Sequence, residues 1–152
     1  MIAELLMAGV FAHGVITASD PIFQQWADEA HVPTASATVV QEGSREYSAT
    51  TIGATIHWAY DSGATHDFAL SRPLLYHELG HVYDFTTLSN RRRLRIGKIL
   101  YGFSWLWDRE WFAMAYSYCA LGAYPWPGWF GYGYGPPAAK QRRVCHIIRR
   151  GG

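Results

Sequence analysis

The stretch LLYHELGHVYDF (residues 74–85) carries the clearest structural pattern in this chain. Leu75, Leu79 and Val82 recur at helical spacing, which predicts an α-helix with one apolar face. Ser71 precedes the stretch as the expected N-cap, and the proline two residues later suits the first helical turn. We therefore expect the helix to begin at Ser71 and to pack its apolar face against the core.

Within this helix, residues 77–81 read HELGH, an H-E-x-x-H motif. Helix positions four apart lie on one face about one turn apart, which places His77 and His81 to bind one Zn²⁺. Glu78 is placed to act as general base on a water whose pKa the metal lowers towards about 7. Gly80 costs about 1 kcal/mol relative to Ala in a helix interior, so we expect a packing reason for it. The alternative is that both histidines are solvated bystanders.

A catalytic zinc needs a third protein ligand and an open position for water. The longer metzincin motif has Gly and His three and six residues past the second ligand. This chain has Asp84 and Thr87 there, so that class is excluded. Three acids follow the motif: Asp84, Asp108 and Glu110.

Each of these acids has a different expected role. Asp84 lies one turn past His81 and suits a hydrogen bond that orients His77 or His81. Asp108 is the expected cap of the next helix. Glu110 is therefore the candidate third ligand, and a structural carboxylate near a helix N-terminus is the alternative.

Two segments of the chain together resemble the gluzincin peptidases. They read HELGHVYD at residues 77–84 and EWFAMAY at residues 110–116. The nearest pattern is that of the catalytic domain of anthrax lethal factor and the Pro-Pro endopeptidases, H-E-[LF]-G-H-A-x-D followed by E-[FY]-F-A-E-A-F. The similarity covers about residues 71–121, under half of the chain. It implies three zinc ligands and one general base, which are His77, His81, Glu110 and Glu78.

The chain departs from the family pattern at two positions. Met114 stands where the family has a second Glu, so one acid near the metal is missing. Phe103 stands where the family has the Tyr that stabilises the oxyanion. Tyr101 is the expected substitute, ahead of Tyr83 and Tyr116. An oxyanion donor is commonly worth about 10²–10³ in rate, so an enzyme without one is expected to be slow, highly selective or inactive.

The rest of the chain predicts a fold of the α+β class. Strands are expected at residues 37–41 and 51–60, which are rich in Thr, Val and Ile. Further helices are expected at residues 21–30, 90–101, 109–121 and 138–149. We predict one compact domain over residues 1–152, with a small, mostly antiparallel sheet packed on the motif helix and a mainly helical C-terminal half.

The resemblance adds a zincin-like arrangement to this expectation. It implies that residues 51–60 form an exposed edge strand that holds an extended peptide by backbone pairing. An ordinary core strand is the alternative, and the two are compatible. His57, on the same strand, is expected to be packed or solvated rather than a metal ligand.

Composition and charge limit the classes of partner. With 49% apolar and 16% charged residues, the chain is not of the disordered class. The net charge of +1 conceals a division, because residues 1–88 carry a net −8 and residues 89–152 a net +9. Ten bases lie in residues 91–98 and 140–150. They can bind nucleic acid by counterion release and base stacking, although no nucleic-acid motif is present and a solvated face is the alternative.

Three further features leave alternatives open. No apolar run reaches the roughly 18 residues of a membrane-spanning helix. Residues 5–16 favour a buried N-terminal helix over a cleaved signal, because no Lys or Arg precedes them, and intracellular and secreted locations both fit the sequence.

Cys119 and Cys145 are expected to be buried thiols, with a disulfide as the alternative. The aromatic segment from Gly122 to Pro137 is expected to be an irregular loop and a possible docking surface for an assembly partner.

These features predict a zinc-dependent peptidase in which Glu78 activates a zinc-bound water to hydrolyse a peptide bond. The expected partner is a peptide or protein substrate. The alternatives are a non-catalytic zinc protein that acts in an assembly and a basic nucleic-acid-binding module.

Overall fold

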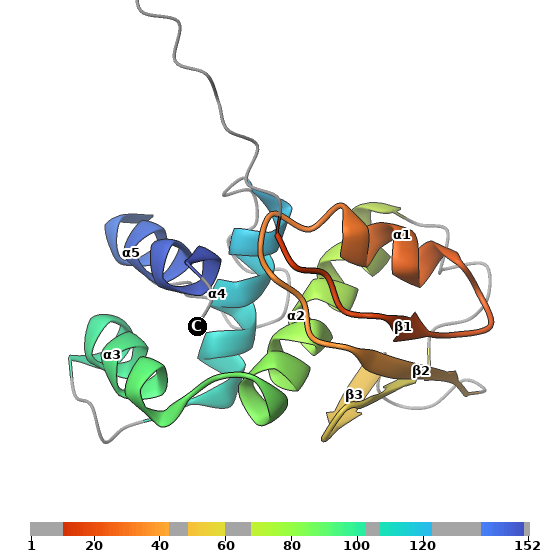
Figure 1. Ribbon diagram of the computed structural model, residues 1–152, viewed down its shortest axis with the longest axis horizontal. Helices are drawn as coiled ribbons and strands as arrows, with labels where there is room; N and C mark the ends of the chain where they lie inside the picture. Colours follow the sequence, from red (N-terminus) through yellow and green to blue (C-terminus); the bar gives the residue numbers. More distant parts are fainter. Residues whose placement is uncertain (1–10, 43–48, 60–67, 103–106, 123–137, 151–152) are drawn as a thin grey trace, which may run out of the picture.

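In the computed structural model the described parts of the chain are residues 11–42, 49–59, 68–102, 107–122 and 138–150. A small sheet lies at one end of the molecule and α3 (Asn90–Tyr101) and α5 (Ala138–Arg149) lie at the other, with α2 (Phe68–Thr86) and α4 (Arg109–Leu121) between them (Figure 1). The remaining elements are β1 (Ile16–Thr17), α1 (Ile22–Asp28), β2 (Ala37–Gln41), β3 (Ala49–Ile52) and β4 (Thr55–Trp58). The predicted α+β class is confirmed.

The four strands in the described part of the chain lie in the order β1-β2-β4-β3. β1 and β2 run parallel, as do β2 and β4, whereas β3 and β4 run antiparallel. The sheet is therefore mixed, and the predicted mostly antiparallel sheet is wrong. The reason is the connection between β1 and β2, which contains α1 and returns the chain to the same end of the sheet, as a parallel pair requires.

Residues 51–60, which were predicted as one strand, instead contain a hairpin turn. Ile52 at the end of β3 pairs with Thr55 at the start of β4, which leaves a two-residue loop. Gly53, the first loop residue, has a φ of 60°, and glycine at this position is typical of a type II′ hairpin turn. β4 is paired on both sides, so within the described residues the edge strand on this side is β3.

The helices after α2 follow the prediction. α3, α4 and α5 have the predicted bounds, and β2 matches as well. Ser89 and Asp108 cap α3 and α4 by accepting hydrogen bonds from backbone N–H groups of the first turn, which have no partner inside the helix. α2 begins three residues before Ser71, so the predicted cap is wrong and Pro73 lies inside the helix. None of the helices within the described ranges is long and apolar enough to cross a membrane.

The N-terminal helix predicted for residues 5–16 is not found in its described part. Residues 11–15 are not helical and lead into β1, while residues 5–10 lie outside the described residues. The backbone here pairs with the segment before β2, with hydrogen bonds from the Gly14 N–H to the Thr34 carbonyl and from the Thr34 N–H to the Ala12 carbonyl. These long-range bonds use backbone N–H and carbonyl groups that would bond to one another within a helix.

A disulfide joins Cys119 of α4 to Cys145 of α5, so the favoured prediction of two thiols is wrong. Packing of α5 on α4 brings the two Cα atoms to 5.2 Å, within the range that a disulfide spans. The side-chain amide of Gln141 is buried beside the bridge and donates a 2.7 Å hydrogen bond to the Ala115 carbonyl. The aromatic segment at residues 123–137, which connects these helices, lies outside the described residues.

α2 is the central helix of the core, and α4 crosses it at close range. Leu75, Leu79 and Val82 are fully buried, as their spacing predicts. A Cβ atom added at Gly80 would lie 2.9 Å from the Ala113 Cα and 3.0 Å from the Tyr116 Cβ, both on α4. The packing reason expected for Gly80 is therefore the close approach of α4.

We expect Gly80→Ala to destabilise the protein, although alanine is the better helix former by about 1 kcal/mol. The added methyl group forces α4 away from α2, and overpacking of this kind costs about 1–3 kcal/mol. Urea unfolding of the two proteins measures the difference. A free energy of unfolding that is unchanged or higher in the variant would contradict the close helix contact.

Candidate metal centre

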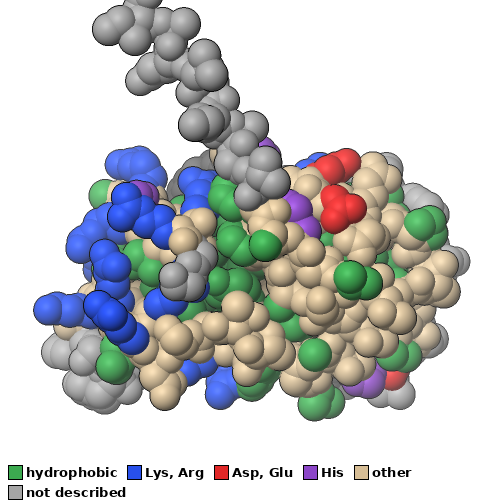
Figure 2. All heavy atoms as spheres, viewed as in Figure 1, with side chains coloured by type: hydrophobic (Ala, Val, Ile, Leu, Met, Phe, Trp, Pro, Cys, Tyr) green, Lys and Arg blue, Asp and Glu red, His purple; other side chains and the backbone are tan. Residues whose placement is uncertain are grey.

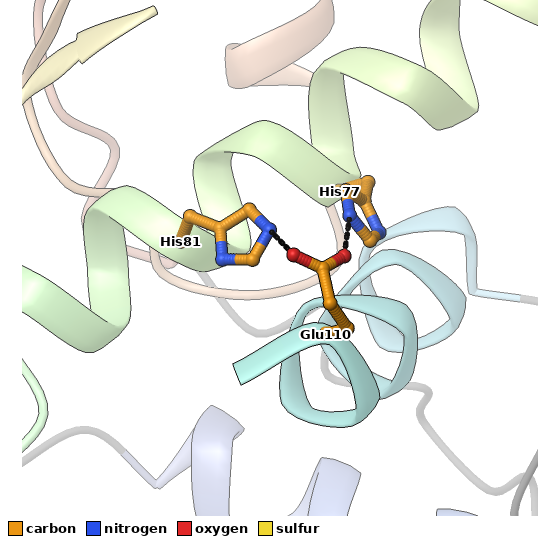
Figure 3. Close-up of side chains that lie close together, drawn as sticks. All are labelled: His77, His81 and Glu110. Carbon is orange, nitrogen blue, oxygen red and sulfur yellow. Dashed lines mark hydrogen bonds and ion pairs between the residues drawn. The ribbon is translucent and has the colours of Figure 1, made fainter. Parts of the chain in front are cut away.

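Three side chains from two helices meet beside the crossing of α2 and α4. His77 and His81 project from successive turns of α2 towards Glu110 in the first turn of α4 (Figure 3). The Nε2 atom of His77 lies 3.0 Å from Oε2 of Glu110, and Nε2 of His81 lies 3.1 Å from Oε1. One ligand atom of each residue lies within 4.8 Å of the others. The structure thus brings together the three residues that were predicted as metal ligands.

The local sequence explains this meeting. The four-residue spacing puts both imidazoles on one face of α2, with ring centroids 4.9 Å apart. The Asp108 cap begins α4 immediately before Glu110, and the absence of a side chain at Gly80 lets α4 approach α2. Glu110 therefore reaches the histidines from the neighbouring helix.

The donor atoms of the cluster are of the kinds that zinc binds in proteins. Tetrahedral zinc with bonds of about 2.0–2.2 Å separates its ligand atoms by about 3.3–3.6 Å. The 3.0 and 3.1 Å contacts use different oxygens of Glu110, and the three ligand atoms lie within 4.8 Å of one another. Binding of one ion would therefore require the side chains to rearrange around it. His77 and His81 are buried, while the Glu110 side chain is 43% exposed. Two imidazoles and one carboxylate form a ligand set of catalytic zinc sites, which keep one position open.

The electrostatics of the cluster follow from these contacts. Hydrogen bonds from His77 and His81 hold the pKa of the Glu110 carboxyl well below its usual range, against the opposing effect of burial. Burial by itself lowers the pKa of His81, but the Glu110 hydrogen bond and the charges of Glu110, Glu78 and Asp84 outweigh it and raise that pKa. The metal-free protein therefore holds a proton on His81 more firmly than a free imidazole does.

This raised pKa predicts how zinc binding depends on pH. His81 must lose its proton to bind zinc, so zinc affinity is expected to keep rising above pH 6.5, the ordinary pKa of histidine. In the metal-free protein, protonated His81 stabilises the fold below about pH 6.5, and this contribution is lost as the pH rises through the raised pKa. Competition with a chromophoric chelator measures the affinity. An affinity that is constant above pH 6.5 would contradict the raised pKa.

Glu78, the predicted general base, is buried next to the cluster. It is 4% exposed, and its Oε2 accepts a short hydrogen bond from the Thr51 hydroxyl of the edge strand β3. The sequence pattern did not predict this role for Thr51, because residues 51–60 resemble one continuous strand and not a hairpin. In the structure Thr51 is half-buried and its two neighbours in β3 are exposed, but the sequence ATTI does not alternate in polarity and gave no signal of this.

Asp84 is fully buried, but its partners differ from the predicted imidazole. Its Oδ1 accepts hydrogen bonds from the Arg93 guanidinium at 2.7 and 3.1 Å, and its Oδ2 accepts one from the Trp107 indole at 3.1 Å. The carboxylate faces α3 and the residues before α4 because it lies beyond the turn that carries His81. Asp84 thus fastens α2 to both neighbouring segments, and it acts on His81 through its charge.

Tyr101, the predicted oxyanion donor, lies at the end of α3 beside the start of α4. Its hydroxyl donates a 2.7 Å hydrogen bond to the Asp108 carbonyl, and burial strongly raises its pKa. Its role in oxyanion stabilisation stays a prediction, and Phe103 lies outside the described residues. Tyr83 and Tyr116 make hydrogen bonds with other parts of the protein. His57 contacts Glu42 at 2.8 Å and is not part of the cluster.

Comparisons of the chain with protein-family models, curated proteins and solved structures gave no match. The functional conclusion therefore rests on the side chains of the cluster and on the sequence resemblance of its two motifs.

Proposed function

We propose that this protein is a zinc-dependent peptidase of the gluzincin type with a zincin-like arrangement around its active centre. The observation that carries the proposal is the meeting of the Glu110 carboxylate with both imidazoles of the HELGH helix. A chance H-E-x-x-H sequence gives no reason for a carboxylate 29 residues past the second histidine to meet both rings.

The residues of the cluster divide the chemistry between them. His77, His81 and Glu110 would hold the metal, and a bound zinc ion supplies the Lewis acidity that polarises a carbonyl and lowers the pKa of a water. Glu78 takes a proton from the attacking water and passes it to the amine that leaves when the peptide bond breaks. Thr51 holds the Glu78 carboxylate in place through its hydroxyl group.

An extended substrate can lie along β3. Within the described residues this strand pairs only with β4, so its other edge has backbone groups for a further strand. Thr51 connects this strand directly to Glu78. A peptide paired with β3 would therefore run next to the proposed general base.

We expect Thr51→Val to lower kcat by roughly 10–100-fold, the usual effect of losing a partner that orients a group at a metal site. Valine keeps the shape of the side chain but cannot donate the hydrogen bond to Glu78, whereas Thr51→Ser should restore most of the activity. Thr50→Val on the exposed face of the same strand is the matched control, with little effect expected. Steady-state kinetics and zinc content are measured for all three variants. A kcat equal to that of the wild type in Thr51→Val would contradict the positioning role.

The proposed activity is tested with purified protein that carries one zinc ion per chain. Incubation with a diverse peptide library, followed by mass spectrometry, should reveal internal cleavage products. Cleavage should stop on addition of a strong chelator and return on addition of zinc. If the zinc-loaded protein cleaves no peptide, this result would contradict the proposed peptidase function and favour a structural zinc site.

A further inference from the structure

A strongly basic groove runs between α3 and α5, at the end of the molecule opposite the sheet. Figure 2 shows Lys and Arg side chains gathered over this end. The larger section of the groove has a volume of about 820 Å³ and the adjoining section about 410 Å³. Both sections are lined by Arg95, His146 and Ile147, so they form one continuous groove.

The groove has cations on both walls. Arg95 and Lys98 line the α3 wall, and Lys140 and Arg143 line the α5 wall. Neither helix contains an Asp or Glu residue, and no acidic side chain is among the described residues that line the groove. This density of like charge attracts a polyanionic partner.

The bases of α3 are not all available for such a partner. Arg92 donates a 2.6 Å hydrogen bond to the Ile147 carbonyl and so holds α3 against α5. Arg93 is paired with Asp84 on α2. Within the described parts of the chain, Arg95 and Lys98 make no such side-chain contact with a neighbouring helix, and they line the groove instead. The basic run in the sequence therefore separates into bases that hold the fold together and bases that line the groove.

The floor of the groove indicates the class of partner. Ile99, Ala139 and Ile147 contribute apolar surface between the charged walls. No Phe, Tyr or Trp side chain is among the described lining residues, and His146 supplies the one imidazole ring among them, whereas proteins that bind single-stranded nucleic acid stack successive bases on aromatic rings. α3 has 12 residues and is about 18 Å long, a length that an extended peptide of about five or six residues spans. Acidic side chains would meet the walls and apolar ones the floor.

We propose that the groove between α3 and α5 binds an extended acidic segment of a polypeptide that also carries apolar side chains. Binding of this segment does not require catalysis. The segment would belong to the substrate, which the groove would hold outside the active centre. This assignment rests on the proposed peptidase function.

The test measures fluorescence anisotropy of a labelled dodecapeptide of Glu, Leu and Gly. The zinc-loaded Glu78→Gln protein is used so that the probe stays intact. We expect saturable binding that weakens as salt is added. Lys98→Ala/Arg143→Ala, made in the same background, should weaken it by roughly tenfold, as loss of two exposed ion pairs predicts.

Two controls separate this site from general electrostatic attraction. Val15→Glu/Thr38→Glu lowers the net charge by the same amount at exposed positions of the β1 and β2 region, and it should leave the affinity unchanged. An oligothymidylate of the same length should bind more weakly than the acidic peptide. Tighter binding of the oligothymidylate, equal losses in both double variants, or no binding of the peptide would each overturn the proposal. Cleavage of short neutral peptides by the wild type reports on the peptidase separately.

Discussion

Glu78→Gln is expected to lower kcat by about 10²–10⁴-fold, the usual contribution of a general base, while the protein still binds one zinc ion. The amide keeps the size of the side chain and can still contact the Thr51 hydroxyl, but it cannot take a proton from water. The metal ligands proposed here are His77, His81 and Glu110, so removal of the Glu78 charge leaves all three in place. Peptide cleavage and zinc content are measured on the same preparation.

Glu42→Gln is the matched control for this substitution. It makes the same chemical change to a carboxylate that contacts His57 instead of the metal cluster, and activity should stay near that of the wild type. If Glu78→Gln retains activity within a few-fold of the wild type, Glu78 is not the general base. If it instead loses its zinc, Glu78 belongs to the ligand set and the proposed division of roles is wrong.

The second large effect is expected from the disulfide between Cys119 and Cys145. The bridge closes a loop with a sequence separation of 26 residues, and its removal in Cys119→Ser/Cys145→Ser should lower the free energy of unfolding by about 3 kcal/mol. Because the bridge ties α5 to α4, the loss should also weaken binding in the basic groove more than it weakens zinc binding. Urea unfolding of the metal-free proteins measures the stability difference.

Reduction provides an independent control for that result. The wild type in excess reductant should unfold at the same urea concentration as the double variant, because both lack the bridge. An oxidised wild type with the same unfolding midpoint as the double variant would contradict a stabilising disulfide. A difference between the reduced wild type and the variant would mean that the serine hydroxyls themselves disturb the packing around Gln141.

The parts of the fold that were predicted correctly are those with local signals. Ser89 and Asp108 are caps that act within one turn, and they locate the starts of α3 and α4. The mixed sheet was not predicted, because the direction of a strand depends on the path of the chain through α1. The hairpin has a local signal in Gly53, but the β-branched residues on both sides made it resemble one continuous strand.

In the candidate site, too, features with a signal in the sequence could be predicted and long-range contacts could not. Glu110 could be selected from the sequence because few acids follow the motif and only one of them has no simpler role. Thr51 lies 27 residues before Glu78, and its contact depends on how β3 lies along α2. The disulfide likewise depends on the packing of α5 against α4, which a count of two cysteines does not determine. Asp84 lies near the histidines in sequence, but the nearby Arg93 and Trp107 donate hydrogen bonds to both of its oxygens.

The most direct test of the metal centre is anomalous diffraction at the zinc absorption edge from crystals of the zinc-loaded wild type. We expect one peak about 2.0–2.2 Å from Nε2 of His77, Nε2 of His81 and a carboxylate oxygen of Glu110, with a fourth position free of protein ligands. A peak with Glu110 turned away from it, or with a fourth protein side chain bound, would contradict the proposed catalytic site.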